Sequence, residues 1–259
     1  DPAEFVARKC LRVNLSDIAA MGANPMIYFI ALSLPKNIDH KWLKLFAHGL
    51  QHDQDTYKIN LSGGDTVSTP GPLTVSVTML GQIQVDKALQ RSNAKLGDDI
   101  WVSGTIGDAG LALKIIKGEI CVDDFGTRKF LIERFHLPEP RVTLGIGLIG
   151  IANSAVDVSD GLVADLENIC NASGLGAVVQ GSKIPLSDKL SLIAANSEVL
   201  SLSDILSGGD DYELIFTAPP KHAGDIEYLS EKIGLGISRI GTIVKGDCVR
   251  IIGTEGQEL

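Results

Sequence analysis

The sequence lacks the features that would place the protein in a membrane, outside the cell or on nucleic acid. Its longest weakly polar run covers residues 145–152, and a membrane-spanning helix needs roughly 20 apolar residues. Only four cysteines are present, widely separated and without a Cys-x-x-Cys pair, which is typical of free thiols in a reducing compartment. No secretory signal opens the chain, and the net charge of -9 disfavours nucleic acid and anionic lipid as partners. We therefore expect a cytoplasmic protein.

Several common catalytic signatures are also missing. Residues 176–183 resemble a phosphate-binding loop, but Ser182 and Lys183 stand in the wrong order and the interior is strand-like. His48 and His52 are four residues apart without the Glu that follows the first His in zinc proteases. The chain has neither a Gly-x-Ser-x-Gly elbow nor a His-Arg-Asp motif. Any phosphoryl transfer is thus of neither the P-loop nor the protein-kinase type.

Hydrophobic patterning in the first third predicts helices alternating with strands. Helical spacing covers residues 2–22, as one helix or as two joined at 14–17, and an amphipathic helix begins near His40. Strands are predicted at 26–34, at 59–66, where the strand runs into a glycine turn, and at 73–83. In the last strand apolar residues alternate with Thr and Ser, so one face is expected to be polar.

The polar, turn-rich stretch at 87–99 is the best domain boundary. It divides the chain into domains 1–92 and 93–259. Beyond it we expect further strands and helices in alternation, with strands at 100–105, 154–160, 176–180, 212–218 and 238–244 and helices at 108–117, 128–135, 142–151 and 162–170. This pattern favours two domains of the α+β or α/β class, of unequal size, with mixed sheets flanked by helices.

The stretch Ser-Ala-Val-Asp-Val-Ser-Asp-Gly at 154–161 places carboxylates where a strand gives way to a helix. Asp160 is predicted to cap that helix, because a carboxylate there accepts backbone N–H groups. Asp157 ends the strand with no cap to make, which leaves a metal-ligand role open. Asp165, one turn into the helix, is expected to be a solvated surface charge.

Two further acidic turns have the same design. In the stretch 60–66, two glycines allow close backbone approach to a ligand and are followed by Asp65, although a tight turn explains them equally well. In the stretch 206–214, Gly208 suits a helix end, whereas Asp210 and Asp211 have no evident structural reason. Three such turns predict a converging polyanionic site, which needs cations to function.

Two other residues have ordinary explanations beside a functional one. Asp17 is expected early in a helix capped by Asn14 or Ser16, where its charge complements the helix dipole. Arg91 is a lone arginine in a loop, and only a nearby phosphate would give it a role.

Taken together, the motifs at 13–25, 61–66, 89–110, 155–166 and 206–214 resemble, in order, those of the thiamine-monophosphate kinase family. That family is part of the aminoimidazole-ribonucleotide synthetase-like superfamily, and the resemblance covers most of the chain. It implies the two-domain superfamily fold and ATP-dependent phosphorylation of thiamine monophosphate to thiamine diphosphate, by direct in-line transfer with Mg²⁺. It also implies a homodimer formed by pairing of N-terminal sheets.

The resemblance assigns roles residue by residue. The metal ligands would be Asp17, Asp65, Asp157 and Asp160. The contacts to ATP would come from Gly64, Asp65, Arg91 and Ser159. Asp210 would contact the substrate, with a side chain shorter than the Glu usual there. Several carboxylates with Mg²⁺ would form an electrostatic clamp on phosphate groups, which is most of what phosphoryl transfer needs.

The sequence also departs from the family pattern. Family members carry, ahead of the position of Asp1, further metal ligands and a His that contacts substrate, and near the C-terminus an aromatic residue that packs on substrate. For residues 1–259 alone we therefore expect weak or no activity. Two alternatives stay open: another ATP-using enzyme of the superfamily, and a non-catalytic nucleotide-binding dimer scaffold.

Overall fold

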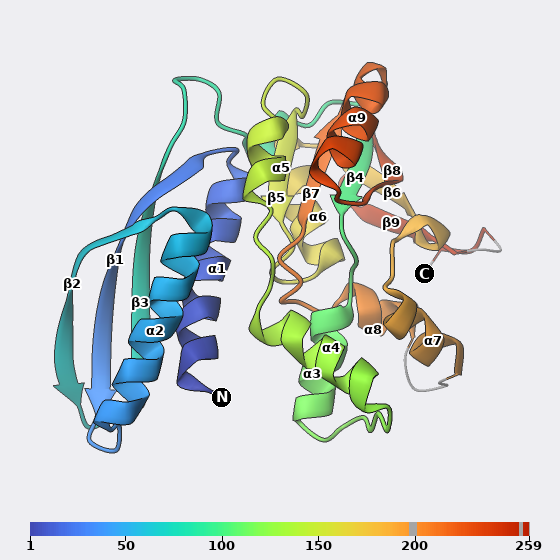
Figure 1. The fold of residues 1–259 in the computed structure, drawn as a ribbon. Helices are drawn as coiled ribbons and strands as arrows, with labels where there is room; N and C mark the ends of the chain where they lie inside the picture. The colour runs from blue at the N-terminus through green and yellow to red at the C-terminus, as the bar shows by residue number, and fades with distance from the viewer. Residues whose placement is uncertain (197–200, 254–255, 259) are drawn as a thin grey trace.

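The computed structural model describes residues 1–196, 201–253 and 256–258. Within these residues the strands form a three-stranded sheet and a six-stranded sheet, which stand side by side in Figure 1. The first sheet and its helices come from residues 3–82, and the second from residues 99–252. The 92/93 boundary predicted from sequence falls between the two sheets.

The small sheet has the order β2-β1-β3. Its central strand β1 (Asn24–Pro35) runs parallel to β2 (Asn60–Thr69) and antiparallel to β3 (Thr74–Gln82). Helices α1 (Ala3–Ala20) and α2 (His40–Tyr57) cover one face, and Asp39 caps α2 through a bond from the Trp42 amide. Val75, Val77 and Met79 of β3 pack into the core beneath these helices, whereas Thr74, Ser76 and Thr78 are exposed. The predicted polar face of this strand is confirmed.

The large sheet is mixed, with the order β5-β7-β4-β8-β6-β9. Its strands are β4 (Asp99–Ser103), β5 (Ser154–Asp157), β6 (Gly176–Gln180), β7 (Leu214–Ala218), β8 (Ile237–Val244) and β9 (Val249–Ile252). The helices around it are α3 (Asp108–Ile116), α4 (Phe125–His136), α5 (Val142–Gly147), α6 (Leu162–Ser173), α7 (Asp188–Asn196), α8 (Leu202–Leu206) and α9 (Ala223–Ile233). Short 3₁₀ helices are η1 (Arg91–Asn93), η2 (Gly181–Lys183) and η3 (Pro220–His222). The α+β prediction is confirmed; β9 was not anticipated.

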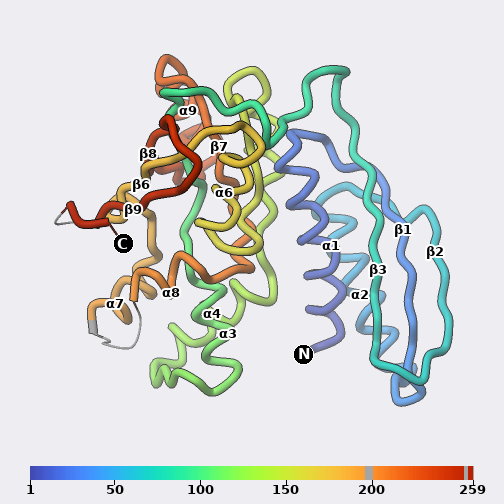
Figure 2. Tube along the Cα trace, turned by 180° about the vertical axis from the view of Figure 1, so that it is seen from behind, coloured from blue at the N-terminus to red at the C-terminus, as the bar shows by residue number. Residues whose placement is uncertain are grey.

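Helix α1 lies between the two sheets in both views (Figures 1 and 2). Leu11 and Leu15 belong to the core of the small sheet, whereas Ala19 and Ala20 pack with Trp101 and Leu144 of the other half. Small residues allow the backbones to approach closely here. A Cβ on Gly145 would lie 2.0 Å from the Ala19 carbonyl oxygen. Residues on α1 are therefore placed to act on both halves of the molecule.

Two local predictions in this half were wrong. Helix α1 is continuous, so Asn14 and Ser16 are not caps: Asn14 Nδ2 donates to the Cys10 carbonyl 2.8 Å away, within the helix. The stretch 60–66 is not a turn but part of the continuous edge strand β2, which carries a bulge opposite Tyr28 and Phe29. Gly64 is required there, because a Cβ would lie 1.8 Å from the carbonyl oxygen of Ile30.

The cysteines Cys10, Cys121, Cys170 and Cys248 are free thiols, as predicted, although Cys121 and Cys248 are exposed. Among the described residues, every helix is too short or too polar to cross a membrane.

Candidate functional site

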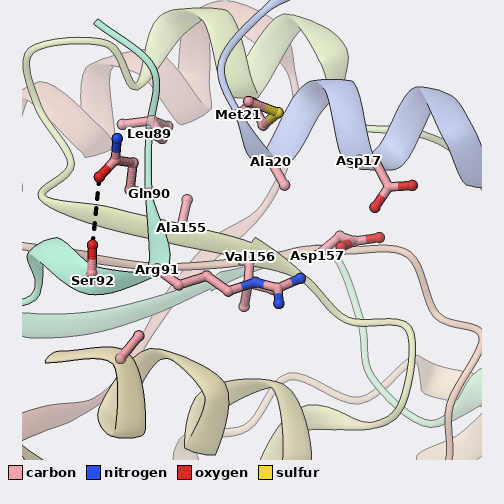
Figure 3. Close-up of a pocket in the computed structure, with 11 residues that line it drawn as sticks. Asp17, Ala20, Met21, Leu89, Gln90, Arg91, Ser92, Ala155, Val156 and Asp157 are labelled. Carbon is pink, nitrogen blue, oxygen red and sulfur yellow. Dashed lines mark hydrogen bonds between the residues drawn. The ribbon is translucent and has the colours of Figure 1, made fainter. Parts of the chain in front are cut away.

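A pocket of about 400 Å³ opens where α1 faces β5 and the segment that leads into the second sheet. Figure 3 shows acidic side chains at one end of this pocket and apolar and amide side chains towards the other. The lining residues are Asp17, Ala20, Met21, Leu89, Gln90, Arg91, Ser92, Ala155, Val156, Asp157 and Ala172. Its shape offers a charged end and an apolar end to a single ligand.

Asp17 and Asp157 approach the pocket from different halves of the chain. Asp157 ends β5 and is 4 % exposed, with the Ser16 hydroxyl donating to its Oδ2 over 2.8 Å. Asp17 lies in the last turn of α1, so the prediction of an early helical position was wrong. A negative charge there opposes the helix dipole. The Asp17 carboxylate therefore lies at a helix end that disfavours negative charge.

The electrostatics of this pair favour a bound cation. Desolvation raises the pKa of Asp157, and the charge of Asp17 raises it further, while the Ser16 hydrogen bond and Arg91 oppose the shift. Desolvation also raises the pKa of Asp17, again opposed by Arg91. The Arg91 side chain, from the exposed helix η1, extends towards Asp157 in Figure 3. Two close carboxylates with raised pKa values are stabilised by added positive charge.

The carboxylates fit one kind of metal better than others. Among the described residues, no three His, Cys, Asp or Glu side chains lie close enough to enclose an ion by themselves. Mg²⁺ is commonly held by one or two carboxylates together with phosphate oxygens and water. The Asp17–Asp157 pair therefore suits a magnesium ion that arrives with a nucleotide.

Two of the three acidic stretches pack against each other, and residues of one of them, 154–166, line the pocket. The loop 207–213 packs on the loop after β5, with the Asp210 amide donating to the Ser159 carbonyl over 2.9 Å and the Tyr212 amide to the Val158 carbonyl over 2.8 Å. A Cβ on Gly209 would lie 2.4 Å from the Ser159 carbonyl oxygen. Glycine is needed at that position for the two loops to meet.

The roles of Asp160 and Asp165 are the reverse of those predicted. Gly161 is the N-cap of α6, with no side-chain cap bond, and Asp160 is exposed. Asp165 is 2 % exposed and accepts the amides of Ser159 and Asp160, each over 2.9 Å. A buried carboxylate that accepts two amides fixes the loop from inside, which leaves Asp160 free to face solvent or a ligand.

Asp211 has a structural role that was not evident from the sequence. It is 1 % exposed and accepts the amides of Gly107 and Ala109 at the start of α3, over 2.7 and 3.3 Å. The Asp211 carboxylate thus occupies the N-terminus of α3, which follows the glycine turn at 104–107. Asp210 instead turns to α1, where Lys9 Nζ lies 3.3 Å from its Oδ1.

Gly64 and Asp65 lie elsewhere in this chain. Both are exposed on β2, the outer edge of the small sheet, and neither is among the residues that line the pocket. Asp65 Oδ1 accepts the Thr66 amide over 2.8 Å. The acidic stretches at 154–166 and 206–214 therefore meet through their loops, and the one at 60–66 lies apart from them on β2.

Comparison with known proteins identifies the family of both halves. Residues 1–83 match the family model "AIR synthase related protein, N-terminal domain", and residues 95–253 match its C-terminal counterpart. A thiamine-monophosphate kinase of Escherichia coli K12 is 41 % identical over 251 residues, which cover 96 % of this chain and 75 % of the relative.

Two solved structures are similar over nearly the whole chain. The crystal structure of a thiamine-monophosphate kinase from Stenotrophomonas maltophilia is 41 % identical, with a TM-score of 0.88, and the match covers 99 % of this chain and 80 % of that one. A structure described as AaThiL complexed with AMPPCP and TMP is 29 % identical, with a TM-score of 0.85 over 100 % and 79 % of the two chains.

Proposed function

The chain belongs to the thiamine-monophosphate kinases of the AIR synthase related family, and we propose that it transfers the γ-phosphate of ATP to thiamine monophosphate. The products are thiamine diphosphate and ADP. One observation carries this assignment: Asp17, Asp157 and Arg91 meet around one pocket, in a fold whose relative binds an ATP analogue and TMP. Carboxylates, a cation and an apolar recess are the parts that a metal-bound nucleotide requires.

The position of each residue around the pocket indicates which part of the substrates it would bind. Asp17 and Asp157 would hold Mg²⁺, and Asp160, exposed on the loop after β5, would bind a further Mg²⁺. Magnesium, when bound, neutralises charge on the phosphate oxygens. Arg91, whose side chain extends towards Asp157 in Figure 3, would donate to phosphate, and Ser159 would contact the nucleotide from the loop after β5. Ala20, Met21 and Ala155 provide the apolar end for the nucleoside. The reaction then depends on holding two anions in line, with no covalent intermediate.

Gly64 and Asp65 remain proposed contacts to ATP and Mg²⁺, although β2 lies at the outer edge of the small sheet. We propose a homodimer as well. The small sheet exposes large apolar side chains of the kind that subunit interfaces bury, namely Met26, Phe29, Leu61, Val67 and Leu80. A dimer would be expected by light scattering after gel filtration. We place the protein in the cytoplasm, where its free cysteines would stay reduced.

The test is product formation by protein expressed from the complete reading frame. We expect thiamine diphosphate and ADP to form, detected by liquid chromatography, only when ATP, Mg²⁺ and thiamine monophosphate are all present. Asp17→Asn and Asp157→Asn should each lower the rate at least about 100-fold, because each removes charge that the transition state needs. Asp55→Asn, an exposed carboxylate on α2, is the matched control and should leave the rate unchanged.

Two results would redirect the assignment. Turnover with an aminoimidazole precursor in place of thiamine monophosphate would indicate another enzyme of the superfamily. Binding of Mg-ATP by calorimetry, without ADP release when thiamine monophosphate is added, would indicate a nucleotide-binding scaffold.

A further inference from the structure

A buried arginine on α1 joins the two halves of the molecule. Arg12 is 6 % exposed, and its Nε and Nη2 donate to the two carboxylate oxygens of Asp53 on α2, over 2.8 and 3.3 Å. Its Nη1 donates to the carbonyl oxygens of Leu137 and Pro138, over 3.3 and 3.0 Å. These carbonyls directly follow α4, in the half that contains the large sheet. The planar guanidinium thus binds a carboxylate of one half and a helix C-terminus of the other.

Asp53 fixes the orientation of this guanidinium. The Asp53 side chain is fully buried, and a buried carboxylate needs a paired charge. A pair that uses both carboxylate oxygens holds the guanidinium plane in one direction. Helices α1 and α2 also approach closely, since a Cβ on Gly49 would lie 2.5 Å from the carbonyl oxygen of Glu4. The direction of Arg12 Nη1 is therefore set within the first half of the chain.

Arg12 lies one helical turn before the residues of α1 that reach the pocket. Residues four apart on a helix share a face, and Ser16 donates to Asp157 Oδ2 over 2.8 Å. The next residue, Asp17, lines the pocket together with Asp157. Further along the helix, Ala19 packs closely on α5. Asp17 is thus held between two points at which α1 is attached to the second half.

Resting on the metal and nucleotide site proposed above, we propose that Arg12 is a positioning residue, which fixes α1 against the second half so that Asp17 and Asp157 share one cation. The two carboxylates come from different halves, and a displacement of α1 by about 1 Å would change the distance between them. They repel one another when no cation is bound, so the geometry of the pair depends on an outside constraint. Arg12 is not among the residues that line the pocket, and it acts through the two carboxylates.

The experiment compares Arg12 with Arg8, one turn earlier on α1. Arg8 Nε donates to the same Asp53 over 3.0 Å, and among the described residues its hydrogen bonds and ion pairs go to Asp53 alone. Arg12→Gln and Arg8→Gln each remove one cation from Asp53, but only Arg12→Gln detaches α1 from the C-terminus of α4. We expect Arg12→Gln to weaken Mg-ATP binding about tenfold by calorimetry, and Arg8→Gln by less than about twofold.

Arg12→Lys separates positioning from stability. A single ammonium group can pair with Asp53, but it lacks the fork that also reaches the carbonyls after α4. We expect this variant to regain most of the free energy of unfolding in urea that Arg12→Gln loses, while the tenfold loss of Mg-ATP affinity remains. A purely structural role would make affinity and stability recover together. Arg12→Lys also provides the test if Arg12→Gln does not fold.

A double variant shows whether the effect passes through Asp17. In an Asp17→Asn background, Arg12→Lys should weaken Mg-ATP binding by less than about twofold, because the carboxylate that Arg12 positions has lost its charge. Additive losses in the double variant would overturn the inference. So would equal losses of affinity in Arg8→Gln and Arg12→Gln, or an Arg12→Lys variant with the affinity of the unmodified protein.

Formation of thiamine diphosphate by the unmodified protein is measured in parallel. Absence of this product, with Mg-ATP still bound, would mean that the proposed function fails. The affinities of the Arg12 and Arg8 variants would still decide the role of Arg12, so the two failures are distinguished.

Discussion

Two groups of buried charge in this molecule are built in opposite ways. Around Glu213, which is fully buried, Arg141 donates from Nε over 2.6 Å, Arg134 from Nη2 over 3.1 Å and Ser103 from its hydroxyl over 2.6 Å. Asp157 instead accepts a hydrogen bond from the Ser16 hydroxyl over 2.8 Å and faces a second carboxylate, Asp17, while the exposed Arg91 side chain extends towards it in Figure 3.

The pKa values of Glu213 and Asp157 are shifted in opposite directions, as the two surroundings would predict. Burial acts to raise the pKa of Glu213, but the hydrogen bonds and charges of Arg141 and Arg134 lower it overall. The pKa of Asp157 stays raised by desolvation and by Asp17. A buried carboxylate whose charge is neutralised by arginines needs no ligand. A pair of carboxylates with excess negative charge is stabilised by a bound cation. We infer that the first cluster serves stability and the second serves binding.

Glu213→Gln should have the largest effect on stability. It removes the buried carboxylate charge that Arg141 and Arg134 share, and breaking such a buried pair costs about 3–5 kcal/mol. The free energy of unfolding, measured in urea, should fall by about that amount. Glu133→Gln is the matched control: this residue pairs with Lys129 on the surface of α4, where about 0.5 kcal/mol or less is expected. Equal losses in the two variants would contradict the comparison.

Asp211 should give a pH dependence of stability. Burial raises its pKa to about 7 from an ordinary 3.8, although the amides of Gly107 and Ala109 and the charge of Arg134 oppose the shift. Between these values the folded protein binds a proton that the unfolded chain does not, so stability falls as pH rises from about 4 to 7. Asp211→Asn keeps an acceptor for Gly107 and should flatten this slope, by a few kcal/mol at most. An unchanged slope in the urea series would contradict it.

The sequence predicted the local parts of this architecture well. The helix from His40, the alternating strand β3 and the helix after the Asp157 strand follow from short-range periodicity, which depends on which face of an element is buried. The motif order also identified the family. These predictions need only neighbours within a few residues.

Errors arose where distant segments decide the role of a residue. Asp165 has the spacing of a surface charge, but it is buried and accepts the loop amides of Ser159 and Asp160, six and five residues earlier. Ser16 resembles a helix cap, but its partner Asp157 lies 141 residues away. The role of Glu213 could not be predicted from the apolar strand in which it was placed, since its partners Arg141 and Ser103 are 72 and 110 residues distant. The periodicity of a single sequence contains no information on such pairs.

Asp157→Asn should separate binding from stability. The amide oxygen still accepts from Ser16, while removal of the charge relieves repulsion with Asp17. Stability in urea should therefore stay within about 1 kcal/mol of the original or increase, as is common when a functional residue is replaced. Mg-ATP affinity should fall at least about tenfold in the same preparation. A stability loss like that of Glu213→Gln would show that Asp157 belongs to the structural class instead.

Arg91→Ala should change stability least, because the Arg91 side chain is exposed. We expect less than about 0.5 kcal/mol in urea. Its charge favours the ionised forms of Asp17 and Asp157, so without it both carboxylates should titrate at higher pH. Mg-ATP affinity should weaken about tenfold, and the loss should shrink as salt rises from 50 to about 500 mM, because salt screens an exposed charge. Arg239→Ala, whose arginine pairs with Asp99 on the large sheet, is the control and should leave nucleotide affinity unchanged at either salt concentration. A loss of affinity that does not depend on salt would mean that Arg91 acts by shaping the pocket and not by its charge.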